Sequence, residues 1–263
     1  GHPAGGHAAG GHPAGGHAAG GHAAGGHDQH GAPGHAHGDA GPADDRGLSL
    51  LTSGHDHGTG EVVALDAATQ ATLDDQLAAT GEVIDRYPTA ADALAAGFTR
   101  QGPFTPGLGT HYIAPATQPV VGTVDRAELS TPVLVYDGPG PDAPLAGLMY
   151  TSRSTRAAPE GFAGPNDHWH QHEDVCVVPR AGGGADTPFG VDRGDVTAAM
   201  CAGVGGEWIR RIQYMVHVWT VPGHENPDGV FAEVNPAITC PDGTYHEVDW
   251  REIGTRTSTC RSG

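Results

Sequence analysis

The sequence predicts a mainly β fold with a helical N-terminal arm, that is, an α+β domain built as a single β-sandwich or barrel, behind a disordered tail. Three observations predict it. The composition changes abruptly near residue 60, two patterns with helical spacing and helix-capping residues follow, and apolar runs of strand length separated by Gly- and Pro-rich turns fill the remainder. We therefore divide the chain into a tail, residues 1–60, and one β-rich domain, residues 61–263, with helices near residues 67–97.

Residues 1–60 consist mostly of Gly, Ala, His and Pro and include no aromatic side chain. Because such a segment cannot bury enough apolar surface to offset its chain entropy, we expect it to be disordered. One histidine recurs every five residues, a spacing that fits neither a helix nor a strand, at His2, His7, His12, His17, His22 and His27. Less regular histidines follow at His30, His35, His37, His55 and His57.

Neutral imidazoles bind Zn, Cu and Ni, and a mobile chain can bring several of them onto one ion at the cost of closing a loop. The repeats therefore predict weak capture of transition metal by the tail, and self-association of chains through a shared ion is a further expectation. A simple spacer is the alternative interpretation.

Two helices are predicted at the start of the folded domain. The first runs between Asp66, a candidate N-cap, and Tyr87, and Pro88 should end it. The second runs from Thr89, another N-cap candidate, to Gly97 as its C-cap. The apolar face of the first helix is formed by Leu73, Leu77, Ile84 and Tyr87.

Four strands are expected beyond Phe98. Residues 133–136 and 145–150 flank a Gly- and Pro-rich turn and predict a hairpin. Residues 168–178 form a third candidate strand, and residues 208–221 form the longest and most apolar one. Elsewhere Gly and Pro are dense, which predicts long loops.

The four cysteines include no C-x-x-C pair, so a zinc ribbon or a thioredoxin-type motif is not expected. An even number of widely spaced cysteines favours two disulfides in an oxidising compartment, and sequence order favours Cys176–Cys201 and Cys240–Cys260. By the loop-entropy argument each would contribute about 3 kcal/mol. Four reduced, buried thiols are the alternative.

The formal net charge of −18 argues against nucleic acid and against anionic membrane as partners, because both require a basic patch. No apolar run is long enough to span a bilayer, so no membrane insertion is expected. With the cysteines, this predicts a secreted or otherwise extracytoplasmic protein. The sequence contains no nucleophile elbow, P-loop, H-E-x-x-H or dinucleotide-binding motif.

The densest chemical signal is the run D-H-W-H-Q-H-E-D at residues 167–174. On a strand, alternate side chains share a face, so His168, His170 and His172 would project together, about 6.5–7 Å from one to the next. Two such imidazoles can converge on one ion, whereas three in a row rarely do, so one of them should have another role. The run predicts a metal site, because three imidazoles on one half-buried face otherwise need three separate partners.

A further ligand should come from a different strand. His217 is the lone histidine in an otherwise apolar run, and His111 follows glycines that allow close approach of the backbone. Each of these two could equally be a satisfied core histidine. Additional ligands, or groups that orient an imidazole, are expected among Asp167, Glu173, His224 and Glu225.

Three stretches carry a resemblance: G-L-G-T-H-Y-I at 107–113, P-E-G-F-A-G-P-N-D-H-W-H-Q-H at 159–172 and M-V-H-V-W-T-V-P-G-H-E-N-P-D-G-V-F-A-E-V-N-P at 215–236. They resemble a group of bacterial proteins, mostly predicted to be secreted and without an assigned activity, from about residue 67 to Cys240. Many members read G-x-H-[YW]-x-N-P at the first site, where this chain has Ile-Ala-Pro after the aromatic residue. The resemblance implies that the candidate site positions to examine are His111, His168, His170, His172 and His217.

These observations predict a secreted metal-binding protein whose tail captures transition metal and whose folded domain holds one ion, copper or zinc, with three or four histidines. Two alternatives stay open. One is a secreted mononuclear metalloenzyme, oxidative or hydrolytic, with Glu173, Asp174 or Glu225 as an acid or base. The other is an extracellular structural protein whose chains assemble through metal shared between tails.

Overall fold

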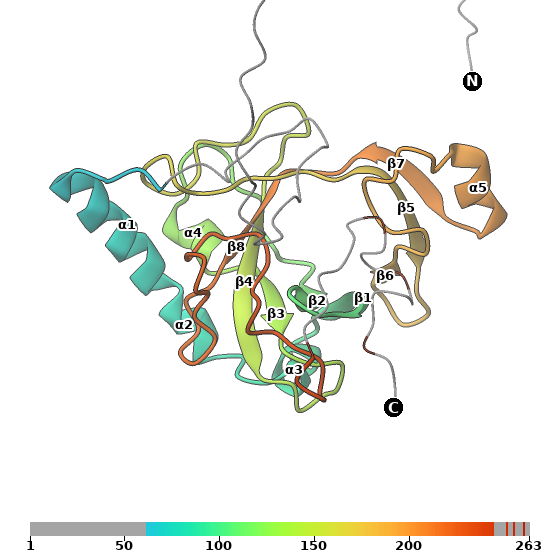
Figure 1. The fold of residues 1–263 in the computed structure, drawn as a ribbon, viewed down its shortest axis with the longest axis horizontal. Coiled ribbons are helices and arrows are strands. Elements are labelled where there is room, and N and C mark those ends of the chain that lie inside the picture. Colours follow the sequence, from blue (N-terminus) through green and yellow to red (C-terminus); the bar gives the residue numbers. More distant parts are fainter. Residues whose placement is uncertain (1–61, 245–250, 252–254, 256–259, 261–263) are drawn as a thin grey trace, which may run out of the picture. The chain divides into compact units, whose positions relative to one another are not determined.

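The computed structural model describes residues 62–244 together with positions 251, 255 and 260. The predicted disorder and metal capture of residues 1–60 lie outside the described residues. The described part is mainly β, as predicted: eight strands form one curled sheet, similar to half a barrel, in the order β7-β5-β6-β1-β2-β3-β4-β8 (Figure 1). The strands are β1 (Thr99–Thr105), β2 (Gly109–Ile113), β3 (Val133–Tyr136), β4 (Leu145–Thr151), β5 (Glu173–Pro179), β6 (Ala185–Asp186), β7 (Glu207–Arg211) and β8 (Met215–Val218).

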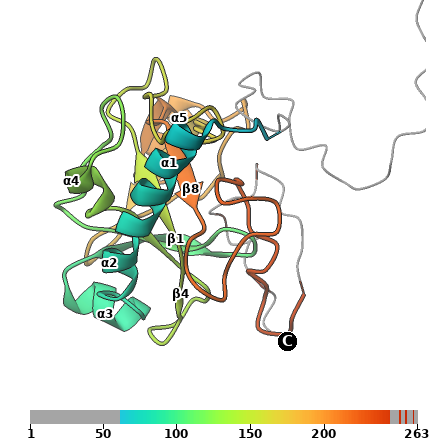
Figure 2. The same ribbon diagram turned by 90° about the vertical axis from the view of Figure 1, so that its left-hand side faces the viewer.

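The helical arm begins at the predicted N-caps Asp66 and Thr89, but the first predicted helix, between Asp66 and Tyr87, is divided at Thr80 and its second part ends at Ile84. The side chain of Asp66 accepts hydrogen bonds from the backbone N–H groups of Ala68 and Thr69 and so starts α1 (Ala67–Ala79). Helix α2 (Gly81–Ile84) continues in nearly the same direction, and Figure 2 shows the two in succession. Thr89 forms a capping box with Asp92 at the start of α3 (Ala90–Ala95), and Gly97 follows it with a φ of 88°.

Two short helices, α4 (Arg126–Leu129) and α5 (Ala198–Gly203), were not predicted. Each is only one to two turns long, so neither develops the apolar periodicity that identifies a helix in a sequence. A capping box at Asp125 and the N-cap Thr197 start them.

The predicted hairpin is confirmed by β3 and β4, which pair antiparallel. The predicted strand over 168–178 is too long: β5 begins only at Glu173, and of the preceding residues His170 alone makes a bridge, to Met215. The prediction of one strand over 208–221 is wrong. Strand β7 pairs with β5, whereas β8 pairs with β4, so the chain crosses between two ladders at residues 212–214.

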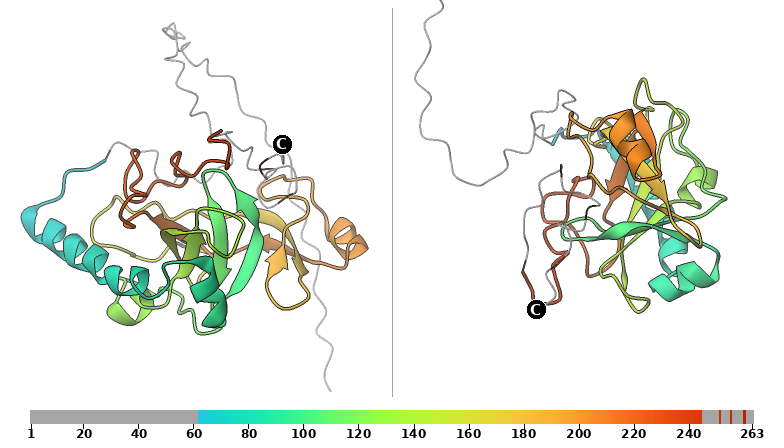
Figure 3. Two further views of the ribbon diagram at one scale, coloured as in Figure 1. Left: turned by 90° about the horizontal axis from the view of Figure 1, so that it is seen from below. Right: turned by 90° about the vertical axis from the view of Figure 1, so that its right-hand side faces the viewer.

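Hydrogen bonds hold this crossing in place. The Ile212 N–H donates to the His172 carbonyl, and Gln171 Nε2 donates to the Ile212 carbonyl at 2.5 Å. The bridge between His170 and Met215 then joins the segment before β5 to β8, the last strand of the sheet. The bridge therefore brings the segment before β5 against β8 at the histidine run, and Figure 3 shows the curled sheet from two further sides.

The alternation of side chains gives the sheet two different faces. Leu134 and Tyr136 of β3 pack in the same core cluster as Leu73 and Val83 of the helical arm. Their neighbours Val133 and Val135 point to the opposite, concave face, where they pack with Met149, Trp219 and other apolar side chains. Residues of β2 and β8 that follow the same alternation, including His111 and His217, therefore point into the curl.

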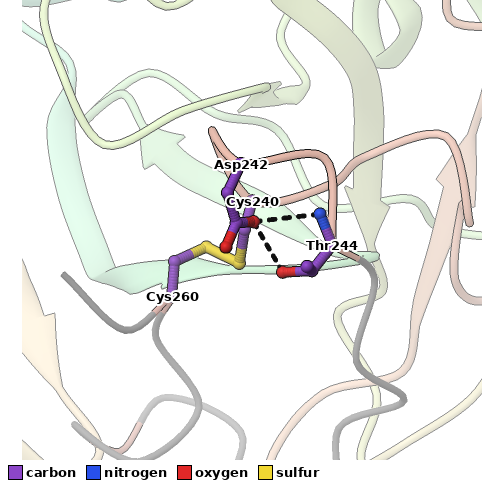
Figure 4. The surroundings of a disulfide bond; sticks show 4 residues. All are labelled: Cys240, Asp242, Thr244 and Cys260. Atoms are coloured by element: carbon purple, nitrogen blue, oxygen red, sulfur yellow. Dashed lines mark hydrogen bonds between the residues drawn. A yellow bond between two sulfur atoms is a disulfide. The ribbon is translucent and has the colours of Figure 1, made fainter. Parts of the chain in front are cut away.

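Both predicted disulfides are present. Cys176–Cys201 joins β5 to α5, and both cysteines are fully buried. Cys240–Cys260 lies beside a turn in which Asp242 Oδ1 accepts hydrogen bonds from the backbone N–H and the hydroxyl of Thr244 (Figure 4). Cys260 packs against the concave-face cluster, so this bridge ties position 260 to the core.

Replacing both Cys176 and Cys201 with alanine should lower the free energy of unfolding by about 3 kcal/mol, because the bridge closes a 25-residue separation that the unfolded chain would otherwise keep open. Urea denaturation under oxidising conditions measures this. A reductant should bring the unaltered protein towards the value of the variant, and a variant as stable as the unaltered protein would contradict the expectation.

Candidate functional site

Four histidines from three distant segments meet on the concave face. His111 comes from β2, His170 and His172 from the segment before β5, and His217 from β8. Ring centroids lie 5.5 Å apart for His111 and His217, 5.6 Å for His170 and His217, and 5.3 Å for His170 and His172. We call these four the histidine cluster. Two imidazoles bound to one tetrahedral ion have centroids about 5 Å apart, so the spacing suits a shared ion.

The curl of the sheet creates this cluster. Strands β2 and β8 are separated by β3 and β4, so in a flat sheet they would lie roughly 14 Å apart. Yet the Nε2 atoms of His111 and His217 are 3.2 Å apart. No short-range pattern in the sequence relates these residues, because their distance depends on the curvature of strands between them.

The contact between His111 and His217 is the closest in the cluster. His217 Nδ1 is buried and has no hydrogen-bond partner among the described residues, so the ring proton is best placed on Nε2, where it can be donated to His111. Two nitrogens that bind one zinc ion at 2.0–2.1 Å are about 3.3 Å apart in tetrahedral geometry. The distance between these two nitrogens therefore matches that between two ligands of one ion.

His172 is oriented by a carboxylate. Its Nδ1 lies 2.7 Å from Asp192 Oδ2, and Asp192 Oδ1 accepts a hydrogen bond from the Glu173 N–H at 2.6 Å. A carboxylate can only accept, so Nδ1 of His172 carries a proton and Nε2 is the nitrogen that could bind an ion. Histidines that bind metal commonly have this arrangement. Asp192 was not predicted as a site residue, because a single carboxylate in a loop belongs to no recognisable motif in the sequence.

The surroundings of His170 and His168 differ from those of His111, His172 and His217. The Nε2 of His170 lies 3.6 Å from Glu233 Oε1, while its ring stacks on that of His217. His168 is half-buried and takes part in none of the ring contacts found in the described chain. The expectation that His168, His170 and His172 share a strand face is wrong, because this segment is not a strand. Glu233 was also not predicted as a site residue.

Burial favours the neutral form of His111, His170 and His217. It lowers the pKa of His111 to about 4, and the neighbouring rings of His172 and His170 add to this shift. Burial also lowers the pKa of His217 well below its ordinary value, with His111, His170 and His172 contributing. The pKa of His170 falls for the same reason, although Glu233 opposes the shift. At neutral pH these imidazoles therefore keep lone pairs that can bind a cation.

The other predicted site residues make contacts elsewhere. Asp167 accepts hydrogen bonds from the Phe162 N–H and from Trp169 Nε1, both at 2.7 Å, and burial raises its pKa to about 6. Glu173 pairs with an arginine, Glu225 accepts a backbone N–H and His224 lies near a carboxylate; the partners are Arg211, Gly223 and Asp137. None of the contacts named here is with a ring of the histidine cluster.

A cavity of about 260 Å³ lies on the concave face beside the cluster. His111, His172 and His217 form part of its wall, and His170 does not. Most of the remaining wall is apolar, with side chains that include Ile113, Val133, Met149, Val175, Val191, Ile212 and Met215. Three imidazoles thus face a space large enough for a small molecule.

Trp219 supports the cluster from one side. Its ring stacks on His217, with centroids 5.5 Å apart and planes 14° apart, and its Nε1 donates to the Ala232 carbonyl beside Glu233. The indole can lie there because Gly147 has no side chain: a Cβ at that position would be 2.6 Å from two ring atoms of Trp219.

No family model matches the sequence, and neither a curated protein nor a solved structure matches it. Among residues 62–244, 251, 255 and 260, no group of three or more His, Cys, Asp or Glu side chains is arranged so that it could hold a metal ion as it stands. None of the helices in the described part of the chain is long and apolar enough to cross a membrane.

Proposed function

We propose that this protein binds one transition-metal ion, copper or zinc, through His111, His172 and His217, and that it works in an extracytoplasmic compartment. The observation that supports this most is the 3.2 Å separation of the Nε2 atoms of His111 and His217, which is close to that of two nitrogens bound to one ion. His172 adds a third imidazole, from another segment, on the wall of the same cavity.

A purely structural role explains the cluster less well. Burying a polar ring costs free energy unless its nitrogens are paired, and apolar side chains would fill the concave face without that cost. His111 and His217 share one contact between them, and the His172 ring is set by a carboxylate, as in many metal sites. In the alternative interpretation the three histidines are ordinary core residues that pair only with their neighbours, and this predicts no affinity for metal.

The extracytoplasmic location is supported by the two disulfides, which form and persist in oxidising compartments. A histidine-bearing tail ahead of the folded domain would raise the local concentration of weakly held ions, and its predicted role is to collect metal near the stronger site. Comparing the metal content of the full chain with that of a chain lacking residues 1–60 tests that role separately.

The decisive experiment uses the full chain with the eleven tail histidines replaced by asparagine, so that only the folded domain can bind metal. Elemental analysis after incubation with zinc or copper(II) and desalting should find one ion per chain. Adding His111→Asn and His217→Asn should remove that ion. His224→Asn is the matched control, since His224 is also partly buried beside a carboxylate but lies outside the cluster, and it should leave the ion in place. Retention of metal by the double variant would overturn the proposal.

Asp192→Asn should weaken metal binding by about 10- to 100-fold, because an amide orients His172 less firmly and makes its ring less basic. The matched control is Asp195→Asn, an exposed carboxylate on the same loop that pairs with Arg193. Competition with a chromophoric chelator measures both affinities. Equal affinities for the two variants would mean that Asp192 does not act through His172.

A metalloenzyme is the second candidate, and one observation favours it: the three proposed ligands line the cavity, so an ion held by them would have an open side. Such an ion supplies a Lewis acid or activated water. X-ray absorption spectroscopy distinguishes the two functions. Three nitrogen ligands with an exchangeable oxygen support catalysis, whereas four protein ligands support binding alone.

A further inference from the structure

The cavity beside the histidine cluster has the properties of a binding site for a small organic molecule. An apolar protein cavity of about 150 Å³ is large enough to bind benzene, so one of 260 Å³ has room for a fused two-ring aromatic molecule. Its walls come from well-packed strands: Val133 and Val175 are at most 2% exposed, and Met149 and Met215 are 9% exposed. A rigid, largely apolar space with a few polar groups on one side is the usual form of a ligand pocket.

The polar side chains of the lining are three histidines of the cluster together with Gln101, Thr105, Thr151 and Thr187. The histidines are His111, His172 and His217, and among the described residues that line the space none is an aspartate, glutamate, arginine or lysine. A charged ligand would lose its hydration without gaining a counter-charge. A neutral ligand with one hydroxyl would bury its rings against the valines and methionines and exchange a hydrogen bond with an imidazole.

We propose that this cavity binds a small, uncharged aromatic alcohol of two-ring size, with its hydroxyl directed at His111, His172 and His217. The apolar walls and the imidazoles are present without any ion, so the proposal goes beyond metal binding and does not depend on it. Partly exposed residues at the edge of the lining, such as Gln101 and Ile113, mark where such a molecule would enter.

The probe is 2-naphthol, titrated by calorimetry into the full-length protein in the presence of a chelator. Saturable binding at one site per chain is expected, with 2-methylnaphthalene and 2-naphthoate each bound at least about tenfold more weakly, because one lacks the hydroxyl and the other is charged. No binding of 2-naphthol up to its solubility limit would overturn the proposal, as would equal affinity for the three compounds.

Two neighbouring positions on β5 provide a matched pair of variants. Val177 lines the cavity, whereas Val178 packs on the other face against the buried cluster around the Cys176–Cys201 bridge. Val177→Phe should fill the space and weaken 2-naphthol by at least about tenfold, and Val178→Phe should change its affinity by less than about twofold. Equal effects of the two variants would place the probe elsewhere and overturn the proposal.

A second measurement covers the case in which Val177→Phe fails to fold. In His111→Asn, the preference for 2-naphthol over 2-methylnaphthalene should fall by about fivefold or more, because an imidazole partner of the hydroxyl is lost. An unchanged preference would overturn the orientation proposed. A protein that takes up zinc but not 2-naphthol rejects this inference alone, and one that binds 2-naphthol but no metal rejects the proposed function alone.

Discussion

His217→Asn should reduce the affinity of the folded domain for zinc or copper(II) by at least about 100-fold, more than any other single change. His217 lies at the centre of the cluster: its Nε2 contacts His111 and its ring stacks against both His170 and Trp219. Removing the ring takes away one ligand and also the group that positions a second. Competition with a chromophoric chelator, on the chain without tail histidines, measures the loss.

The same change should appear in thermal stability. At a free metal concentration 100 times the dissociation constant, binding stabilises the folded state by about 2.7 kcal/mol, and a 100-fold loss of affinity leaves about 0.4 kcal/mol. Metal should therefore raise the melting temperature of the parent protein by several degrees and that of the variant hardly at all. His224→Asn is again the control. If metal protected His217→Asn as well as it protects the parent, the ion would be bound elsewhere.

The metal-free protein should lose stability steeply as the pH falls from about 6.5 to about 4. In this window the unfolded chain protonates His111, whose ordinary pKa is 6.5, while the folded protein keeps it neutral because burial lowers its pKa to about 4. The unfolded state then binds more protons, so stability decreases by about 1.4 kcal/mol per pH unit for this histidine, or about 3 kcal/mol over the window. His217 acts in the same direction.

Asp167 opposes this trend. Its folded pKa is raised to about 6, so it binds a proton more readily in the folded state and contributes stability that is present at low pH and is lost as the pH rises through 6. Because several histidines act against one carboxyl group, the net effect is still destabilisation by acid. Urea denaturation at pH 7, 6, 5 and 4.5 measures the slope, and His111→Asn should make it shallower. A slope identical in the two proteins would show that His111 is not buried and neutral.

Local signals in the sequence predicted the features that depend on few neighbours. The caps at Asp66 and Thr89, the hairpin of residues 133–150 and both disulfides were confirmed, because each is determined by adjacent residues or by the order of four cysteines. Strands β1 and β2 had no predicted bounds, since their glycines and prolines look like loop residues. The break at 212–214 was also missed, because apolar periodicity does not reveal a change of pairing partner.

The candidate site was predicted in part for the same reason. Alternation along a chain could suggest that His170 and His172 are neighbours, and their rings do lie side by side. The contact between His111 and His217 depends on the curl of the sheet. Asp192 can orient His172 only because its loop folds back beside that ring. No regular spacing of residues along the sequence predicts either contact.

Gly147 limits how the concave face of this protein can be redesigned. Even the smallest added side chain there would collide with the indole of Trp219. The indole ring stacks on His217, and its Nε1 donates to the Ala232 carbonyl next to Glu233. In a library that randomises the concave face, glycine at position 147 should thus be retained while the histidines themselves are exchanged for other donors. Any designed site that relies on the position of the Trp219 ring therefore needs a residue without a side chain at position 147.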